Sequence, residues 1–204
     1  PNTFSEPHMP NFPDMLRAIA QCDVCAEHLP FAPKPIFQLH PSARILVVGQ
    51  APGRKAHDAG IPFDDASGDR LRAWMGVTRE VFYDARQIAL LPMGLCFPGT
   101  GKSGDLPPRP ECASQVAHIG RTAILNRLPN IELTLMVGQY AIGFHLPDEK
   151  GTLTDTVQRW RAYFPERLPM PHPSPRNQLW LRRNPWFETE VIPALQARVR
   201  QLLA

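Results

Sequence analysis

Short aliphatic runs alternate with segments of helical periodicity along the chain, and this alternation most constrains the fold. The runs are typical of buried parallel strands; they are RILVVG (44–49), QIALLPM (87–93), ELTLMVG (132–138) and the weaker RLPMPHPS (167–174). Helical patterns occupy 67–75, 79–86, 112–128, 139–146, 153–163 and a segment after Pro185. This order predicts an α/β fold in which helices cover a mainly parallel, four-stranded sheet.

Length and composition favour one domain. A chain of 204 residues with 43% hydrophobic residues can bury a sizeable core and lies within the size range of one domain. Its 24 prolines exceed the average usage of about 5% and predict many irregular connections. We expect a single domain over residues 1–204.

Charge and hydropathy limit which classes of binding partner and which cellular compartment suit this chain. A net charge of +3 and a pI near 8.9 are compatible with a polyanionic partner but identify none. No apolar run approaches the roughly 20 residues that cross a bilayer, and the proline-rich N-terminus lacks the pattern of a secretory signal. We therefore expect a cytoplasmic protein without membrane association, and we expect it to be a monomer.

Ligands of parallel sheets bind beyond the carboxyl ends of the strands, so the loops after the aliphatic runs are the expected site. The first loop, GQAPG, contains Gly49, Pro52 and Gly53. Glycines let backbone N–H groups approach a ligand, and a following helix N-terminus favours negative charge. A tight strand-to-helix turn without a ligand explains these residues equally well.

The second loop contains GTGKS (99–103), which invites comparison with a phosphate-binding loop. That motif needs a glycine where Cys96 stands, and it must open a helix, whereas GDLPPRP follows here. We therefore discount a nucleotide hydrolase. Lys102 is expected to be solvated in a flexible loop, with a DNA phosphate as a possible contact.

The fourth loop begins HPSPRNQLWLRRNPWF (172–187) and mixes basic with aromatic residues. His172 stands at a strand end between two prolines, which favours a functional histidine. Guanidinium groups neutralise phosphates, so a nucleic-acid backbone suits the arginines of this segment, Arg176, Arg182 and Arg183. For Trp180 and Trp186, packing in the core is the stronger interpretation.

GQAPG, IPFDDASGDRL (61–71) and HPSPRN (172–177), in this order on an α/β pattern, resemble the uracil-DNA glycosylase superfamily. The resemblance covers about residues 22–184. It is closest to the iron-sulfur uracil-DNA glycosylases, which share Gly-x-x-Pro-Gly, a Pro-Phe dipeptide soon after it and a four-cysteine pattern. It implies a three-layer α/β/α sandwich, DNA as the partner, and hydrolytic removal of a base without a dissociable organic cofactor.

The four cysteines are the most specific part of the resemblance. Cys22 and Cys25 form a Cys-x-x-Cys pair, and fifteen residues separate Cys96 from Cys112. In a reducing compartment a paired arrangement indicates a metal site before disulfides. The resemblance implies a [4Fe-4S] cluster, and the same thiolates could bind zinc, with His28 in reserve. Its implied role is structural, because it would tie the N-terminal segment, residues 1–42, to the second loop.

The resemblance also implies roles for the loop residues. Breaking the bond between base and deoxyribose develops positive charge on the sugar and negative charge on the base, and both need stabilisation. The base, flipped out at a cost of a few kcal/mol, would stack on Phe63 and accept a hydrogen bond from His172, while Gln50 positions the attacking water. The implied pocket also includes Gly49, Ala51, Pro52 and Gly53. The implied DNA surface includes Ser174, Arg176 and Asn177.

Three positions depart from the family pattern. The relatives carry Glu where this chain has Gln50, and the best-known branch carries Asp where it has Ala51. The Asn that reads the uracil edge in the relatives falls on Pro92, whose side chain cannot hydrogen-bond. The side chain that selects uracil in the relatives is therefore missing, and the sequence does not identify the substrate base.

A nearby carboxylate could replace the missing acid. Asp64 and Asp65 follow Phe63 directly, and His57 and Asp58 precede it. One carboxylate near the sugar would suffice to stabilise its positive charge. Asp65 fits the N-cap of a helix that begins near residue 67 equally well, and a solvated turn is the stronger interpretation for Asp58.

Two functions of different classes follow. One is a DNA glycosylase of base-excision repair that acts on uracil or another deaminated base, with His172, Gln50, Asp64 and Asp65 as catalytic residues. The other is a non-catalytic binder of damaged, abasic or single-stranded DNA that uses the same pocket, which Gln50, Ala51 and Pro92 favour. Action on a free nucleoside or on RNA is a weaker third possibility.

Overall fold

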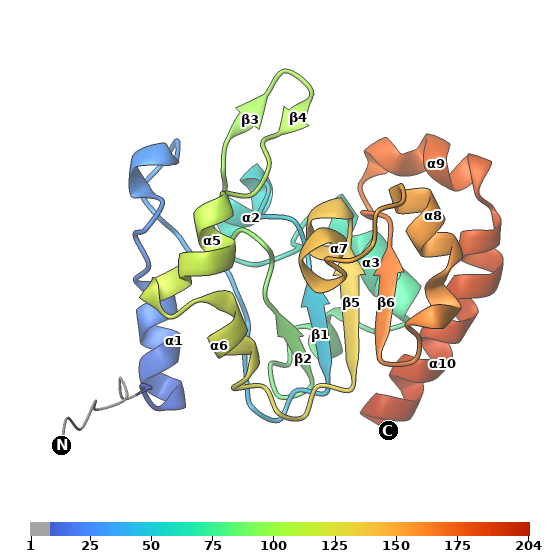
Figure 1. The fold of residues 1–204 in the computed structure, drawn as a ribbon, viewed down its shortest axis with the longest axis horizontal. Helices are drawn as coiled ribbons and strands as arrows, with labels where there is room; N and C mark the ends of the chain where they lie inside the picture. The colour runs from blue at the N-terminus through green and yellow to red at the C-terminus, as the bar shows by residue number, and fades with distance from the viewer. Residues whose placement is uncertain (1–8) are drawn as a thin grey trace.

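The computed structural model describes residues 9–204, so residues 1–8 of the expected single domain lie outside the described residues. At its centre is a sheet of four parallel strands in the order β2-β1-β5-β6 (Figure 1). The strands are β1 (Ile45–Val48), β2 (Ile88–Leu90), β5 (Leu133–Val137) and β6 (Arg167–Met170). This confirms the predicted α/β fold, and each strand lies within one of the aliphatic runs.

Helices cover both faces of the sheet, which is why the strands are apolar at every position. In β1, Ile45 and Val47 face one core and Leu46 and Val48 face the other, each at most 3% exposed. The first core is covered by α3 (Ala66–Met75), α4 (Arg79–Phe82), α8 (Leu153–Gln158), α9 (Gln178–Arg183) and α10 (Ile192–Leu203). The second core is covered by α1 (Phe12–Ala20), α5 (Pro110–Gln115), α6 (Arg121–Leu125) and α7 (Gln139–His145).

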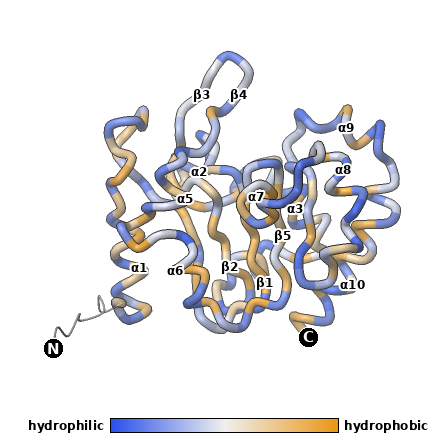
Figure 2. The backbone as a smooth tube through the Cα atoms, viewed as in Figure 1, coloured by the Kyte–Doolittle hydropathy of each residue, from blue (hydrophilic) through white to orange (hydrophobic). Residues whose placement is uncertain are grey.

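Two short elements follow the carboxyl ends of the strands. The helix α2 (Arg54–Ala59) comes directly after the first loop. An antiparallel hairpin of β3 (Thr100–Gly101) and β4 (Gly104–Asp105) projects beyond the sheet (Figure 1) and is hydrophilic at its tip (Figure 2). Lys102 was expected in a flexible loop, but it lies in the turn of this hairpin.

The single helix expected at 112–128 is wrong. A 3₁₀ turn, Val116–His118, separates α5 from α6, and Ala117, His118 and Gly120 have φ values of 53°, 56° and 90°. This turn aims the N–H of Ala117 at Sγ of Cys22, 3.1 Å away. A tertiary contact with a sulfur therefore replaces the hydrogen bonds that would continue the helix.

Two other helices are shorter than expected, and several elements were not expected at all. The helix predicted at 79–86 ends at Phe82, and the one predicted at 153–163 ends at Gln158. In the first case the side chain of Asp84 accepts the N–H of Arg86 at 3.1 Å, which favours a turn. The unexpected elements are α1, α2, α9 and the hairpin.

A buried arginine fixes the chain where it leaves β2. Arg121 is 1% exposed and donates to the carbonyls of Leu91 and Pro92, the latter at 2.7 Å. Its guanidinium lies 5.6 Å from the centre of the Phe144 ring. Burial lowers the pKa of Arg121 to about 10, so the group stays charged at neutral pH. Arg121 thus satisfies two carbonyls that no strand pairs.

Among residues 9–204, the helices are all too short or too polar to cross a bilayer.

Arg121→Met should lower the free energy of unfolding by about 2–4 kcal/mol, because two buried carbonyls lose their donors. Urea unfolding monitored by circular dichroism measures this change. The matched control is Arg200→Met on the exposed face of α10, which should stay within about 0.5 kcal/mol. Equal stability of the two variants would contradict the role given to Arg121.

Candidate active site

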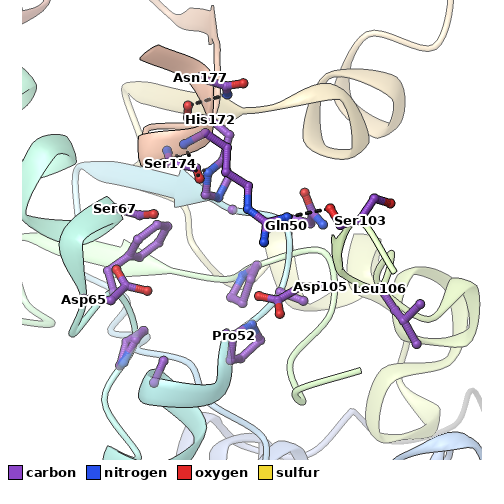
Figure 3. A pocket seen from close by; sticks show the side chains of 18 residues that line it. Gln50, Pro52, Asp65, Ser67, Ser103, Asp105, Leu106, His172, Ser174 and Asn177 are labelled. Atoms are coloured by element: carbon purple, nitrogen blue, oxygen red, sulfur yellow. Dashed lines mark hydrogen bonds between the residues drawn. The ribbon is translucent and has the colours of Figure 1, made fainter. Parts of the chain in front are cut away.

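A pocket of about 340 Å³ opens beyond the carboxyl ends of the strands. Its volume falls within the range of small-molecule sites, about 300–1,000 Å³. It brings together most of the residues predicted from the loops: Gly49, Gln50, Ala51, Pro52, Gly53, Phe63, Asp65, Pro92, His172, Ser174, Arg176 and Asn177. Segments more than 100 positions apart in the sequence therefore line one pocket (Figure 3).

Phe63 lies against the backbone of Gly49. A Cβ built on Gly49 would come within 2.9 Å of Cζ of Phe63, so only glycine leaves room for the ring. Phe63 has a φ of 56°, which is uncommon for a bulky residue and indicates local strain. Arg72 holds this conformation by donating to the Phe63 carbonyl at 3.0 Å, and Phe82 packs edge-on against the ring.

Glycine at position 68 is also required by Phe63. Gly68 lies in the first turn of α3, and a Cβ there would overlap the carbonyl oxygen of Phe63. The N–H of Gly68 donates to Oδ1 of Asp65 at 2.8 Å, which is the N-cap of the helix. The start of α3 and the strained phenylalanine are thus a single packed unit.

His172 follows β6 and is held in one neutral tautomer. The N–H of Ser174 donates to Nδ1 of His172 at 3.2 Å, so the ring proton resides on Nε2. Burial lowers the pKa of His172, while the charges of Asp65 and Asp105 act in the opposite direction. Asn177 fixes the same loop by donating from Nδ2 to the His172 carbonyl at 2.7 Å. The ring is therefore neutral at pH 7, with one N–H to donate.

The acidic residues of the second motif divide between the pocket and the surface. Asp65 caps α3, as one interpretation predicted, and it also lines the pocket, where its catalytic role stays a prediction. Asp64 does not line the pocket, because Arg79 holds its carboxylate at 3.0 Å. Asp58 is exposed and pairs with Arg54, and His57 stacks on Phe31. Asp65 alone of these four contributes to the pocket.

Sequence reasoning missed a second carboxylate in the pocket, that of Asp105 in β4. A Cβ built on Gly53 would lie 3.3 Å from Oδ2 of Asp105 and 4.0 Å from Oδ2 of Asp65. In Figure 3 the two aspartates lie on either side of the space below His172. The available signal was the spacing of Thr100-Gly101 and Gly104-Asp105 around two turn residues, which is typical of a hairpin.

Arg176 joins the hairpin to the loop that carries His172. Its Nη1 donates to the carbonyl of Ser103 at 2.5 Å. Gly104 has a φ of 119°, and a Cβ there would overlap the guanidinium of Arg176. The hairpin is consequently docked across the pocket.

The remaining basic residues lie at the surface. Lys102 is exposed in the turn of the hairpin, and Arg182 and Arg183 are exposed in the last turn of α9. None of the three lines the pocket. The tryptophans pack against the first core, as expected, and Trp180 donates from Nε1 to Thr154 at 2.9 Å.

The three positions that depart from the expected motif also border the pocket. The carbonyl of Gln50 accepts the N–H of Gly94 at 2.8 Å, and Ala51 packs next to Gly94. Pro92 presents its ring to the pocket, while Arg121 occupies its carbonyl. Pro92 therefore offers an apolar surface at the position that corresponds to the Asn of the relatives.

The pattern of these residues agrees with a comparison against protein families. The model of the uracil DNA glycosylase superfamily matches residues 37–196. The chain belongs to this superfamily. The matched residues include every loop that lines the pocket.

The first two cysteines precede the part of the chain that matches the superfamily. In the structure, Cys25 and Cys112 are buried, and Cys22 and Cys96 are partly buried. Burial raises the pKa of Cys25 to about 12, with further contributions from Cys112 and Cys22. Burial likewise raises the pKa of Cys96 to about 12, again with contributions from Cys112 and Cys22. Cys22 and Cys112 thus lie near enough to raise the pKa values of both Cys25 and Cys96.

Backbone amides face two of these sulfurs. Ala117 donates to Sγ of Cys22 at 3.1 Å, and Leu95 donates to Sγ of Cys112 at 3.5 Å. His28 is exposed, and its Nε2 lies 3.9 Å from the carboxylate of Glu111. Within the described part of the chain, no three His, Cys, Asp or Glu side chains are arranged to hold a metal ion.

Gly68→Ala should disrupt the site, because the new Cβ overlaps the Phe63 carbonyl. We expect a loss of about 2–4 kcal/mol in the free energy of unfolding, within the range of overpacking and backbone strain. The matched control is Gly143→Ala in α7, where no atom lies within 4 Å of a new Cβ. It should stabilise the protein by about 0.5–1 kcal/mol. Urea unfolding of both variants checks the sign of each change.

Proposed function

We propose that this chain is a DNA glycosylase of base-excision repair, which hydrolyses the bond between deoxyribose and a flipped-out uracil or other deaminated base. Membership of the superfamily supports glycosylase chemistry on DNA. The observation that carries the proposal is the neutral His172 with its proton on Nε2, in one pocket with Phe63. That pair supplies a stacking surface and a donor for the departing base.

The reaction needs opposite charges stabilised at two places. The base gains negative charge as its bond to the sugar breaks, and the Nε2–H of His172 is suited to donate to a base oxygen. The sugar gains positive charge, and carboxylates at the pocket wall suit that charge. The apolar surfaces of Phe63 and Pro92 exclude water around the base and so strengthen both interactions.

DNA reaches this pocket from the side of the hairpin and the HPSPRN loop. Ser174, Arg176 and Asn177 line its mouth, and Lys102 extends the basic surface at the hairpin turn. Such groups suit phosphate contacts, which position the strand without reading its sequence. Arg182 and Arg183 on α9 form a second basic surface for a longer strand.

We also propose that Cys22, Cys25, Cys96 and Cys112 hold a [4Fe-4S] cluster with a structural role. The four thiols come from the segment after α1, the second loop and α5, and two receive backbone N–H donors, as metal-bound sulfurs commonly do. A tetrahedral zinc with Zn–S bonds of about 2.3 Å needs closely converging ligands. Zinc bound by the same four thiolates is the alternative occupant of this site.

Non-catalytic binding of damaged DNA is the second candidate function. The observation that favours it is the replacement of motif residues by Gln50, Ala51 and Pro92, all of which border the pocket. It predicts affinity for a modified strand without release of a base.

His172→Ala should reduce the rate of base release by about 10²–10³-fold, because one donor to the departing base is lost. Purified protein is incubated with single- and double-stranded DNA carrying one uracil, hypoxanthine or xanthine, and abasic sites are measured. DNA affinity should stay within a few-fold of wild type. His40→Ala, before β1 at the opposite edge of the sheet, is the control and should leave the rate unchanged. Tight binding without release of any base by the wild type would instead support the binder.

Protein purified without oxygen should be brown, absorb near 400 nm, and contain iron and sulfide in about equal amounts, as expected for thiolate-bound [4Fe-4S]. Cys112→Ala should lose both the colour and the iron, because a thiolate ligand is removed. A colourless protein that carries one zinc per chain would contradict the cluster.

A further inference from the structure

We propose that Asp105 is a catalytic carboxylate of this glycosylase, delivered by the β3–β4 hairpin in place of the acid missing from the first motif. This assignment rests on the function proposed above and deepens it. It identifies the group that faces the sugar and the segment of the chain that supplies it.

The position of the Asp105 carboxylate supports this role. Its Oδ2 would lie 3.3 Å from a Cβ on Gly53, directly beside the loop that carries the acid in other branches of the superfamily. Its Oδ1 accepts from Oγ1 of Thr100 at 3.4 Å, a long hydrogen bond that orients the group across the hairpin. One oxygen is therefore held, and the other faces the pocket.

Asp105 also differs from the other aspartates near the pocket. Asp58 pairs with Arg54 and Asp64 with Arg79, each within 3.1 Å, so their charges are already compensated. Asp65 uses Oδ1 to cap α3. Within residues 9–204, Asp105 forms no ion pair. Its charge is thus available to a cationic sugar.

The hairpin holds Asp105 in place through the other half of the site. Arg176 donates to the carbonyl of Ser103, two residues before Asp105, and its guanidinium packs on Gly104. Arg176 follows His172 by four positions. The donor for the base and the carboxylate for the sugar are therefore fixed relative to one another by one contact, which makes Arg176 a positioning residue as well as a DNA contact.

The step balances as a hydrolysis. The bond between the sugar carbon and the base nitrogen breaks, and its electron pair leaves with the base, whose oxygen accepts a hydrogen bond from His172. Water forms the new bond to the sugar carbon and gives a proton to Asp105. That proton then passes to the departed base, so the carboxylate is restored and the products are an abasic site and a neutral base.

Asp105→Asn tests the assignment, because it keeps the shape and the acceptor for Thr100 while removing the charge. We expect the single-turnover rate of base release to fall at least about 100-fold, within the range for a general base. The dissociation constant for the same DNA should stay equal or fall, since a negative charge is lost near phosphates. Asp58→Asn removes the same charge from the nearby surface of α2 and should leave the rate unchanged.

A second variant tests the hairpin. Gly104→Ala leaves Asp105 intact but displaces the hairpin from Arg176, so the rate should fall at least about 10-fold, because small misplacements of catalytic groups are costly. An unchanged rate would overturn the positioning role of Arg176.

The outcomes separate this assignment from the proposed function. A wild-type protein that releases a base while Asp105→Asn matches its rate would overturn the role of Asp105 and leave the glycosylase intact. Loss of activity in Asp65→Asn alone would transfer the role to Asp65. A wild type that releases no base would overturn both proposals.

Discussion

The burial of β1 between two layers of helices is the constraint on which the rest of the structure depends. Both faces of this central strand are covered, and it pairs with β2 on one side and β5 on the other. After β1 the chain leaves the carboxyl edge of the sheet, and there the carbonyls of Gly49 and Gln50 accept N–H groups from Met93 and Gly94. The first two loops are thereby joined at the floor of the pocket.

The pocket walls come from strained and docked segments rather than from the sheet itself. Phe63 takes a left-handed conformation so that its ring can lie on Gly49, and Arg72 holds its carbonyl. The hairpin owes its position to Arg176. The backbone strain at Phe63 indicates that the fold gives up some local stability to build the pocket.

The cysteines and Arg121 connect the N-terminal segment to the same site. Ala117, in the turn that breaks the expected helix, donates to Cys22, and Arg121 at the start of α6 donates to the carbonyls that lead from β2 into the pocket. A cluster held by these cysteines would stiffen the second loop before and after the hairpin, at Cys96 and Cys112. Its contribution would then be to the placement of Pro92 and the residues after it.

The sequence by itself determined the α/β class, the four strands, and the loops that carry Gly49, Phe63 and His172, because strand burial and glycine-proline punctuation depend on local residue type. It could not divide the segment 112–128 into two short helices or dock the hairpin on the pocket. These features depend on hydrogen bonds to Cys22 and Ser103, whose partners lie 95 and 73 positions away. Only the tertiary structure excluded Asp64 and brought Asp105 beside Asp65, since ion pairing and distance across a cavity are properties of packed side chains and not of sequence spacing.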